Sequence, residues 1–174
     1  MIERTITFPI LDKEILFSLE AGEMLSINGR IYTARDQAHR KMLELLKRGE
    51  KLPISLENNA IYYCGPTPPQ KDNLFGSAGP TTSSRMDEAF LVLAEYGLSA
   101  TIGKGERAKE VVEMCRKMGC VYFITFGGAG AYLAKRILSQ KLIAFPELGA
   151  EAIYELVVRD FPVIVGIDTK GRKF

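Results

Sequence analysis

The feature that most constrains the fold of this chain is an alternation of helical and strand-like segments in its second half. Apolar residues recur at helical spacing from Ser83 to about Tyr96, and short apolar stretches follow each helical segment. We predict helices at 83–96, 106–118 and 129–138, and strands at "SATIG", "VYFITF" and "KLIAF". A helix that connects two strands of one sheet usually makes those strands parallel neighbours. The alternation therefore predicts an α/β fold in which helices cover a parallel sheet.

The first third of the chain has a different pattern, rich in β-structure. The stretches "TITFPI", "EILFSL" and "MLSINGRIYTA" indicate short strands separated by turns. Residues 35–50 then predict a helix, with Asp36 as its N-cap and Gly49 as its stop. "AIYYCGP" predicts one more strand, and the long loop 66–80 that follows is typical of a functional or a disordered segment. The tail, residues 153–174, returns to β-hairpin character, with Gly171 in a turn.

Length and composition favour a single domain over residues 1–174. The chain is 47% apolar and 25% charged, which is enough apolar surface for a core and too much for a disordered protein. Its net charge of +2 is too small to indicate a nucleic-acid or membrane partner. We find no apolar leader at the N-terminus, no run long enough to span a bilayer, and no regular cysteine spacing. We therefore expect a cytoplasmic protein with reduced thiols.

Cations gather where the predicted strands pass into helices. At the carboxyl ends of parallel strands, helix N-termini point free N–H groups toward a ligand. Arg35, Arg85 and Lys104 lie at three such junctions, although a cation near a helix N-terminus opposes the helix dipole. A local cost that recurs three times is expected at functional sites more than elsewhere. The pattern predicts a site for a small anion with two or more negative groups. The same junctions carry Thr81, Thr82, Gly127, Gly128 and Gly130.

Simpler interpretations of these junctions remain open at this point. A single arginine near a helix start is most often a solvated surface residue. The glycines of "FGGAG" could serve only to let a helix pack closely on its strand. They also lack the G-x-G-x-x-G spacing of a dinucleotide-binding loop.

The cysteines and the single histidine do not predict a metal site in this chain. Cys115 falls at core-facing spacing in a predicted helix and Cys120 opens a strand, so buried free thiols are favoured over metal ligands. Because His39 is the only histidine, neither a His-based metal site nor a Ser-His-Asp triad can be assembled. We expect His39 to be a surface imidazole, with a substrate contact as the alternative.

Several segments carry motifs of one enzyme family. "GPTTSSRMD" is similar to a GPTT-x-x-RMD signature, and "FPELGAEAIYEL" to a PELG-x-EA-x signature. Further matches, spread over most of the chain, are "INGRIYTARDQAHRK", "YYCGP", "IGKGERAKEV" and "FGGAGAYLAKRI". The chain thus resembles the β subunit, or C-terminal domain, of the iron–sulfur class I fumarases and L-tartrate dehydratases. It departs from the common pattern at Ser83 and Ser84, where the family often has small residues such as Ala-Gly.

The resemblance implies a swivelling β/β/α fold and a hydro-lyase that acts on a four-carbon dicarboxylate. In that family a [4Fe–4S] cluster, held by three cysteines of the α subunit or N-terminal domain, acts as a Lewis acid. The matched motifs do not include that part, so the resemblance implies a separate β subunit. Its expected partner is an α subunit that carries the cluster, in a hetero-oligomer of the α2β2 type.

The resemblance also assigns roles to individual residues. The family's carboxylate-binding arginines fall on Arg35 and Arg85, its lysine on Lys104, and its proposed catalytic threonine on Thr81. A threonine hydroxyl is a poor base, so Thr81 would need cationic neighbours that lower its pKa, or an acid from the partner subunit.

Two questions stay open in the sequence. Ser83 or Ser84 is expected to cap the following helix, and Thr82 has no assigned role. The motifs do not distinguish fumarate hydration to L-malate from L-tartrate dehydration to oxaloacetate. The alternative function is an anion-binding module that is not a hydro-lyase and holds a phosphate or nucleotide with the same three cations.

Overall fold

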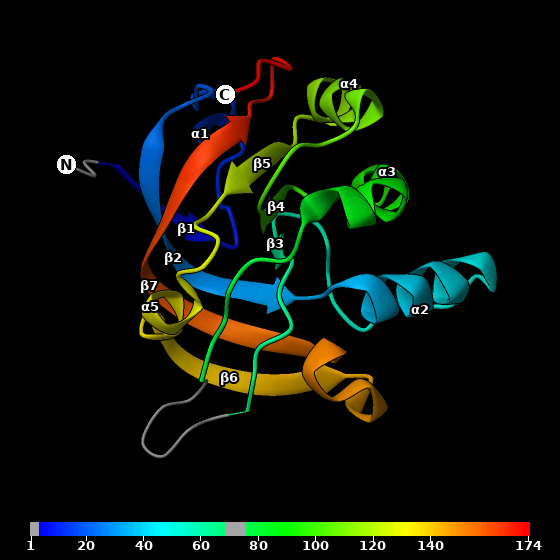
Figure 1. The fold of residues 1–174 in the computed structure, drawn as a ribbon. Helices are drawn as coiled ribbons and strands as arrows, with labels where there is room; N and C mark the ends of the chain where they lie inside the picture. Colours follow the sequence, from blue (N-terminus) through cyan, green and yellow to red (C-terminus); the bar gives the residue numbers. More distant parts are fainter. Residues whose placement is uncertain (1–3, 69–75) are drawn as a thin grey trace.

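The computed structural model describes residues 4–68 and 76–174, which form a seven-stranded mixed sheet covered by helices (Figure 1). The strands are β1 (Arg4–Phe8), β2 (Met24–Thr33), β3 (Ala60–Tyr62), β4 (Ala100–Gly103), β5 (Val121–Ile124), β6 (Ile137–Ala144) and β7 (Ile153–Ile167). The helices are α1 (Glu14–Phe17), α2 (Asp36–Lys47), α3 (Asp87–Glu95), α4 (Lys109–Met118) and α5 (Gly130–Ala134), with 3-10 turns η1 (Ser83–Met86) and η2 (Pro146–Glu151). The α/β prediction is confirmed. Part of the predicted loop 66–80, residues 69–75, lies outside the described ranges.

The first five strands form the parallel part of the sheet. β1 pairs with β2, β2 with β3, β3 with β4, and β4 with β5, each in parallel register. The alternation of helices and strands along the chain predicts this arrangement for β3, β4 and β5. The same prediction is wrong for the strand "KLIAF", which lies largely in β6 and pairs antiparallel with β7 instead of parallel with β5. Because β1 to β5 all run the same way, the residues that follow their carboxyl ends lie along one edge of the sheet.

The long strand β7 closes the sheet on itself. One side of β7 pairs antiparallel with β2, from Met24↔Ile164 to Tyr32↔Glu155. Its other side pairs with β5 near its carboxyl end and with β6 near its amino end. The pairings β2-β3-β4-β5-β7 therefore return to β2, and β1 and β6 are left at the margins. The predicted hairpin tail is wrong in this respect, because residues 153–167 form one continuous strand that joins three others.

Successive strand residues point to opposite faces, and each face has its own apolar core. In β3, Ala60 and Tyr62 belong to one core, and Ile61 belongs to the other. The second core is covered by α2, α3 and α4, which lie together on one side of the sheet (Figure 1). These helices carry the loops of the candidate site at their amino ends.

Two local predictions are wrong. "EILFSL" is not a strand but contains the short helix α1, because Leu16 and Leu19 are both buried three residues apart in the same core. Asp12 accepts the backbone N–H of Glu14 at 3.0 Å and so stabilises the first turn. The predicted helix 129–138 is also shorter, because residue 137 already pairs with β7.

None of the helices in the described ranges has both the length and the apolarity that crossing a bilayer requires.

Candidate functional site

The predicted site residues follow the carboxyl ends of neighbouring parallel strands. Arg35 lies two residues beyond β2, Gly65 three beyond β3, and Lys104 directly after β4. Thr81 and Arg85 come from the segment that leads into α3, and this segment joins the same edge through the backbone hydrogen bond from Thr81 to Tyr63, at 2.6 Å.

Arg35 is held at the start of α2 by residues from two other segments. Its guanidinium lies against Gly65, where a Cβ atom would sit only 2.8 Å from Arg35 Cζ and Nε. Glu151, at the end of η2, places its Oε1 atom 3.3 Å from Arg35 Nε. The side chain of Arg35 stays about one-third exposed (32%), so its outer nitrogens can reach a ligand.

Asp36, the residue after Arg35, pairs with Arg85. The Asp36 carboxylate forms a bidentate pair with the Arg85 guanidinium, through Nε to Oδ1 at 3.1 Å and through Nη2 to Oδ2. Burial alone would raise the pKa of Asp36, but Arg85 and the neighbouring Arg35 lower it below its usual value. Asp36 is therefore a carboxylate stabilised by the charges of both arginines, and the guanidinium of Arg85 remains half-exposed.

The predicted helix cap at Asp36 is wrong for the same reason. The carboxylate is committed to Arg85, and the N-cap position of α2 is Arg35, which makes no capping side-chain bond. Glu151 supplies the missing acceptor, because its Oε1 atom receives the backbone N–H of Gln37 at 3.3 Å. A residue more than 100 positions away in the sequence thus completes this helix start.

The hydroxyl residues of "TTSS" occupy different environments. Thr81 is nearly buried, whereas Thr82 is exposed and forms an isolated bridge with Lys104. Ser83 is fully buried, and its Oγ atom lies 2.9 Å from the Tyr122 hydroxyl. The prediction that Ser83 or Ser84 caps the helix is wrong, because neither η1 nor α3 has a side-chain cap bond.

Lys104 and the glycine-rich segment meet at the end of β4. The backbone carbonyl of Lys104 accepts the N–H of Ser83 at 2.9 Å. A Cβ atom at Gly127 would lie 3.4 Å from Lys104 Cδ, so the glycine segment runs directly beside this side chain. At Gly130 a Cβ atom would come within 3.0 Å of the Gly79 nitrogen. Close packing against the segment before Thr81 therefore accounts for Gly130.

The expectation that His39 is a surface residue is wrong. Its side chain is buried, with its Nδ1 atom 2.8 Å from the backbone carbonyl of Arg35. A carbonyl only accepts hydrogen bonds, so Nδ1 carries the proton, and Nε2 has no hydrogen-bond partner in the described ranges. Burial lowers the pKa of His39 to about 4, and the ring packs edge-on against Tyr63 at 5.4 Å between centroids. A neutral His39 thus donates a hydrogen bond to the backbone carbonyl of Arg35 and helps to fix the position of that residue.

Comparison with known proteins identifies the family. The model of the family described as "Fumarase C-terminus" matches residues 4–174. The chain belongs to the fumarase C-terminus family. It is 40% identical over 167 residues to "Fumarate hydratase class I, aerobic" of Escherichia coli (strain K12), which covers 93% of this chain and 30% of that protein. "Fumarate hydratase 2" of Leishmania major is 39% identical over 161 residues, which are 91% of this chain and 28% of that protein.

A third relative has a similar length to this chain. "Putative L(+)-tartrate dehydratase subunit beta" of Methanocaldococcus jannaschii is 40% identical over 173 residues, covering 95% of this chain and 88% of that protein. This member of the fumarase C-terminus family thus spans less than a third of the two fumarate hydratases but most of a β-subunit relative.

Sequence reasoning missed one buried charged pair of this fumarase C-terminus protein. Arg107 has a fully buried side chain, and its Nε atom lies 2.5 Å from Asp87 Oδ1. Both residues fall within quoted motifs, "RMD" and "KGER", but nothing local in the sequence marks the arginine as buried. Only the packing of α3 against the start of α4 brings the two together.

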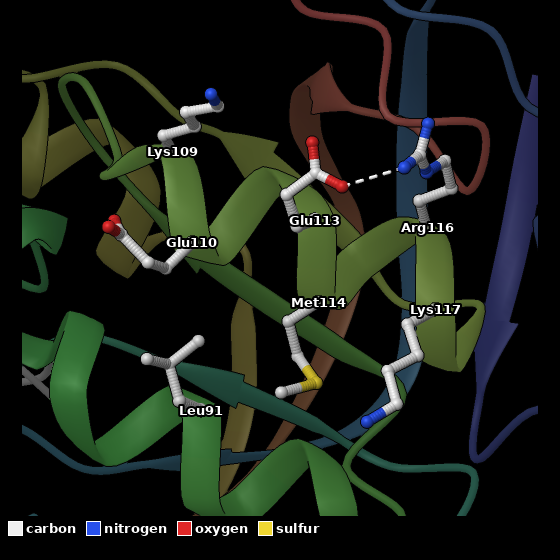
Figure 2. Close-up of a pocket in the computed structure, with 7 residues that line it drawn as sticks. All are labelled: Leu91, Lys109, Glu110, Glu113, Met114, Arg116 and Lys117. Atoms are coloured by element: carbon white, nitrogen blue, oxygen red, sulfur yellow. Dashed lines mark hydrogen bonds and ion pairs between the residues drawn. The ribbon is translucent and has the colours of Figure 1, made fainter.

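One cavity lies away from these residues. It has a volume of about 630 Å³ and lies between α3 and α4, with Leu91 and Met114 among charged residues of α4 (Figure 2). It contains none of the predicted site residues. A smaller cavity of about 270 Å³ borders the Arg35 region, because Pro66, which follows Gly65, and Ala150, which precedes Glu151, line it.

The cysteines of this fumarase C-terminus protein do not fit an iron–sulfur cluster. Cys64 is buried in one core, and Cys115 and Cys120 are buried in the other. Burial raises the pKa of each thiol to about 12, which opposes the thiolate form that binds iron. Within residues 4–68 and 76–174, no group of three or more His, Cys, Asp or Glu side chains is arranged to hold a metal ion.

Proposed function

We propose that this chain is the β subunit of an iron–sulfur hydro-lyase that reversibly hydrates a four-carbon dicarboxylate, with fumarate and L-malate as the first candidate pair. L-tartrate dehydration to oxaloacetate is the second candidate, favoured by the name of the relative of similar length. Arg35, Arg85 and Lys104 bind the substrate carboxylates, and Thr81 takes part in proton transfer.

One observation carries the proposal, namely that the positive charges of two arginines from distant segments both lower the pKa of one carboxylate, Asp36. Arg35 precedes Asp36 in the chain, and Arg85 pairs with Asp36 through both carboxylate oxygens. Asp36 thus shows that the local field stabilises a carboxylate at this position. A dicarboxylate substrate presents the same chemical group to the exposed nitrogens of both guanidinium groups.

The roles follow from the chemistry of the reaction. Removing a proton beside a carboxylate builds negative charge on the substrate, and nearby guanidinium and ammonium groups stabilise that charge. A bidentate arginine also holds the substrate in one orientation, so that one face reacts. Thr81 is nearly buried, and because burial alone disfavours an ionised hydroxyl, its proposed role requires that the positive charges of Arg35, Arg85 and Lys104 offset that cost.

The remaining components are proposed to lie on a partner. The described cysteines do not fit a [4Fe–4S] cluster, so we assign the cluster to an α subunit. We propose a hetero-oligomer of the α2β2 type in the cytoplasm, with residues 1–174 as one domain of the swivelling β/β/α type.

The test is reconstitution. The isolated chain is expected to be colourless and inactive, and to gain hydratase activity when combined anaerobically with a cluster-carrying α-subunit homologue. Fumarate and L-tartrate are assayed side by side to choose between the two substrates. Robust fumarate hydration by the isolated chain would contradict the proposal. Binding of inorganic phosphate or a nucleotide, without any dicarboxylate binding, would favour the simpler anion-binding module.

A further inference from the structure

Two segments that carry predicted site residues are joined by backbone and side-chain hydrogen bonds. Ser83 donates its backbone N–H to the carbonyl of Lys104 at 2.9 Å. The Tyr122 hydroxyl lies 2.9 Å from both Ser83 Oγ and the carbonyl of Gly105. Because a carbonyl only accepts, Tyr122 donates to Gly105 and accepts from Ser83. Segment 81–87, with Thr81 and Arg85, is thereby joined to segment 104–108, with Lys104.

The same two segments are joined a second time by a buried ion pair. Arg107 places its Nε atom 2.5 Å from Asp87 Oδ1, and its side chain has no solvent exposure. The other oxygen of Asp87 accepts the backbone N–H of Ala108 at 2.8 Å. One carboxylate therefore receives both the guanidinium of residue 107 and the backbone of residue 108, which fixes the start of α4 relative to the start of α3.

Aromatic rings complete the surroundings of Arg107. The guanidinium carbon lies 4.8 Å from the ring centroid of Tyr122, 5.2 Å from that of Phe90 and 5.3 Å from that of Tyr63. The remaining nitrogens donate to Thr101 Oγ1 at 3.2 Å and to the Tyr63 hydroxyl at 3.3 Å. Such a guanidinium has a single low-energy position, because displacement would leave a buried charge without its partners.

Tyr63 extends this arrangement to the other site residues. Its hydroxyl accepts from Arg107, and its backbone carbonyl accepts the N–H of Thr81. Its ring packs against His39, which in turn holds the carbonyl of Arg35. Arg107 is thus connected to the backbone of Thr81 through Tyr63. It is connected to Arg85 through Asp87, which is two residues further along the chain, and to Lys104, which is three residues before Arg107 itself.

We propose that Arg107 is a positioning residue, which sets the placement of Thr81, Arg85 and Lys104 through its contacts with Asp87 and Tyr63. It is too deeply buried to touch a substrate, so it acts only through these neighbours. The expected effect on kcat/KM rests on the proposed function, whereas the expected effect on the position of these segments rests on the described contacts alone.

The first test is Arg107→Lys in the reconstituted complex. Lysine keeps the charge but cannot reach Asp87, Thr101 and Tyr63 together, because it lacks the planar fork of donors. The value of kcat/KM is expected to fall by on the order of 10²-fold, since a shift of about 1 Å in catalytic groups costs that much. Measurements are made well below the melting temperature, so that loss of folded protein does not contribute.

Asp168→Asn is the matched control for stability. Asp168 is also fully buried and paired with an arginine, but it lies at the end of β7 and contacts none of the predicted site residues. This variant is expected to lower the melting temperature while kcat/KM stays within about twofold of the wild-type value. If Arg107→Lys behaves like Asp168→Asn, Arg107 has only a structural role and the inference is overturned.

The second test needs no activity. Amide hydrogen exchange is followed at Thr81, Ser83 and Ala108, whose N–H groups all bond within this network. Arg107→Lys should accelerate their exchange by about tenfold or more, and leave Ala21, which bonds to Asp168, unchanged. If the wild-type complex hydrates no dicarboxylate, the proposed function fails and this measurement still decides the inference. Unchanged exchange at all three amides would overturn it.

A milder variant covers the case in which Arg107→Lys does not fold. Tyr63→Phe keeps the ring and the backbone bond to Thr81, and removes only the hydroxyl that accepts from Arg107. It is expected to lower kcat/KM severalfold and to accelerate exchange at Thr81. Wild-type values for both quantities would count against the inference.

Discussion

Arg35 depends on the residue opposite it having no side chain. Gly65 brings its Cα against the guanidinium, and a methyl group there would lie 2.8 Å from Cζ. Arg35 also anchors the start of α2, because its backbone carbonyl accepts hydrogen bonds from the backbone N–H and the ring of His39. A change at Gly65 therefore tests the placement of Arg35 without removing the arginine itself.

We predict that Gly65→Ala raises KM for the dicarboxylate by on the order of tenfold, because the guanidinium must move away from the added methyl group. The backbone at Gly65 is not in the left-handed region, so alanine is compatible with the fold. Steady-state kinetics of the reconstituted complex give the result. In an Arg35→Ala background the same change should have no further effect, and an additive loss would argue against this explanation.

For the arginines themselves, Arg35→Ala or Arg85→Ala is expected to lower kcat/KM by on the order of 10²–10⁴, because a charge-assisted carboxylate contact is lost. Circular dichroism should show that the fold survives, since both side chains are partly exposed. Wild-type kinetics in either variant would mean that the altered residue lies outside the substrate site.

The two threonines have distinct expected phenotypes. Thr81→Val should lower kcat far more than it raises KM, because a hydroxyl in proton transfer matters mainly in the transition state. Thr82→Val should change stability by less than about 0.5 kcal/mol, because Thr82 is exposed and does not cap the helix. If Thr82→Val is instead the inactive variant, the assignment of the catalytic threonine is wrong by one residue.

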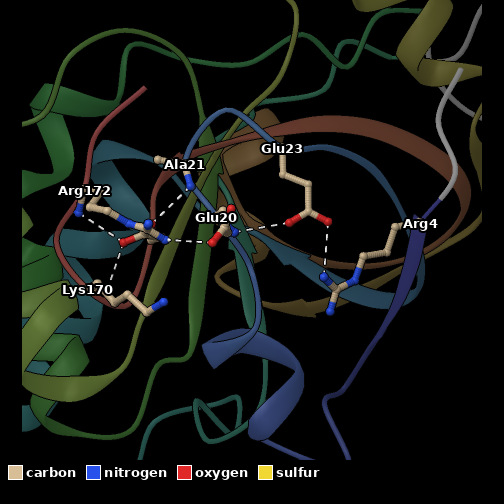
Figure 3. Close-up of polar contacts among 7 residues, drawn as sticks. Arg4, Glu20, Ala21, Glu23, Lys170 and Arg172 are labelled. Carbon is tan, nitrogen blue, oxygen red and sulfur yellow. Dashed lines mark hydrogen bonds and ion pairs between the residues drawn. The ribbon is translucent and has the colours of Figure 1, made fainter.

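At the scale of elements, the tail after β7 is held by one buried carboxylate. Asp168 accepts the backbone N–H groups of Ala21, Lys170 and Arg172 at 2.9–3.1 Å, and the Arg172 guanidinium at 2.7 Å (Figure 3). Burial alone would raise the pKa of Asp168, but these hydrogen bonds outweigh it and the pKa is lowered. The loop before β2 and the end of the chain are joined through this group.

We predict that Asp168→Asn lowers the free energy of unfolding at pH 7 by about 1–3 kcal/mol, because buried N–H groups lose a charged acceptor. Since the folded pKa lies below the unfolded value of about 3.9, the contribution of Asp168 is fully present above that value. It is lost as the pH falls through the folded pKa. Urea unfolding from pH 7 to pH 2 should therefore show a shallower acid loss in the variant. Asp160→Asn, which alters an exposed residue of the same strand, is the control.

At the scale of the whole molecule, β7 is expected to make the unfolding of strands β2 to β5 cooperative. Its partners β2 and β5 come from opposite ends of the series β2-β3-β4-β5, so its pairing closes that series. The marginal strands β1 and β6 each pair with a single neighbour. Opening the closed part requires the loss of two sets of pairings, whereas a marginal strand can separate alone.

Native-state hydrogen exchange should reveal this difference. Amides of β4, β5 and the carboxyl half of β7 are expected to exchange only through global unfolding, so that all of them report the same free energy of opening. Amides of β6 should exchange at least about tenfold faster, because local separation of this strand leaves the closed part intact. Equal protection of β6 and β5 would show that the sheet opens as one unit.

Local patterns in the sequence predicted the order of most helices and strands and located the motifs that follow the strand ends. These features depend on local periodicity and on residues within one segment, and so they could be predicted without the fold. The family could be inferred in the same way, since its signatures are continuous stretches. The roles of Arg35, Arg85, Lys104 and Thr81 stay predictions, although the structure pairs Arg85 with Asp36, the residue next to Arg35.

Three features became apparent only in the folded structure: the continuous strand β7, the burial of His39 and the pairing of Arg107 with Asp87. Each of these depends on contacts between segments far apart in the chain, and local periodicity carries no information about such contacts. From the sequence, a charged or polar side chain is predicted to lie at the surface, because burying it without a partner costs free energy. Asp87, Tyr63 and Thr101 remove that cost for Arg107, and they meet only when the sheet and its helices have packed.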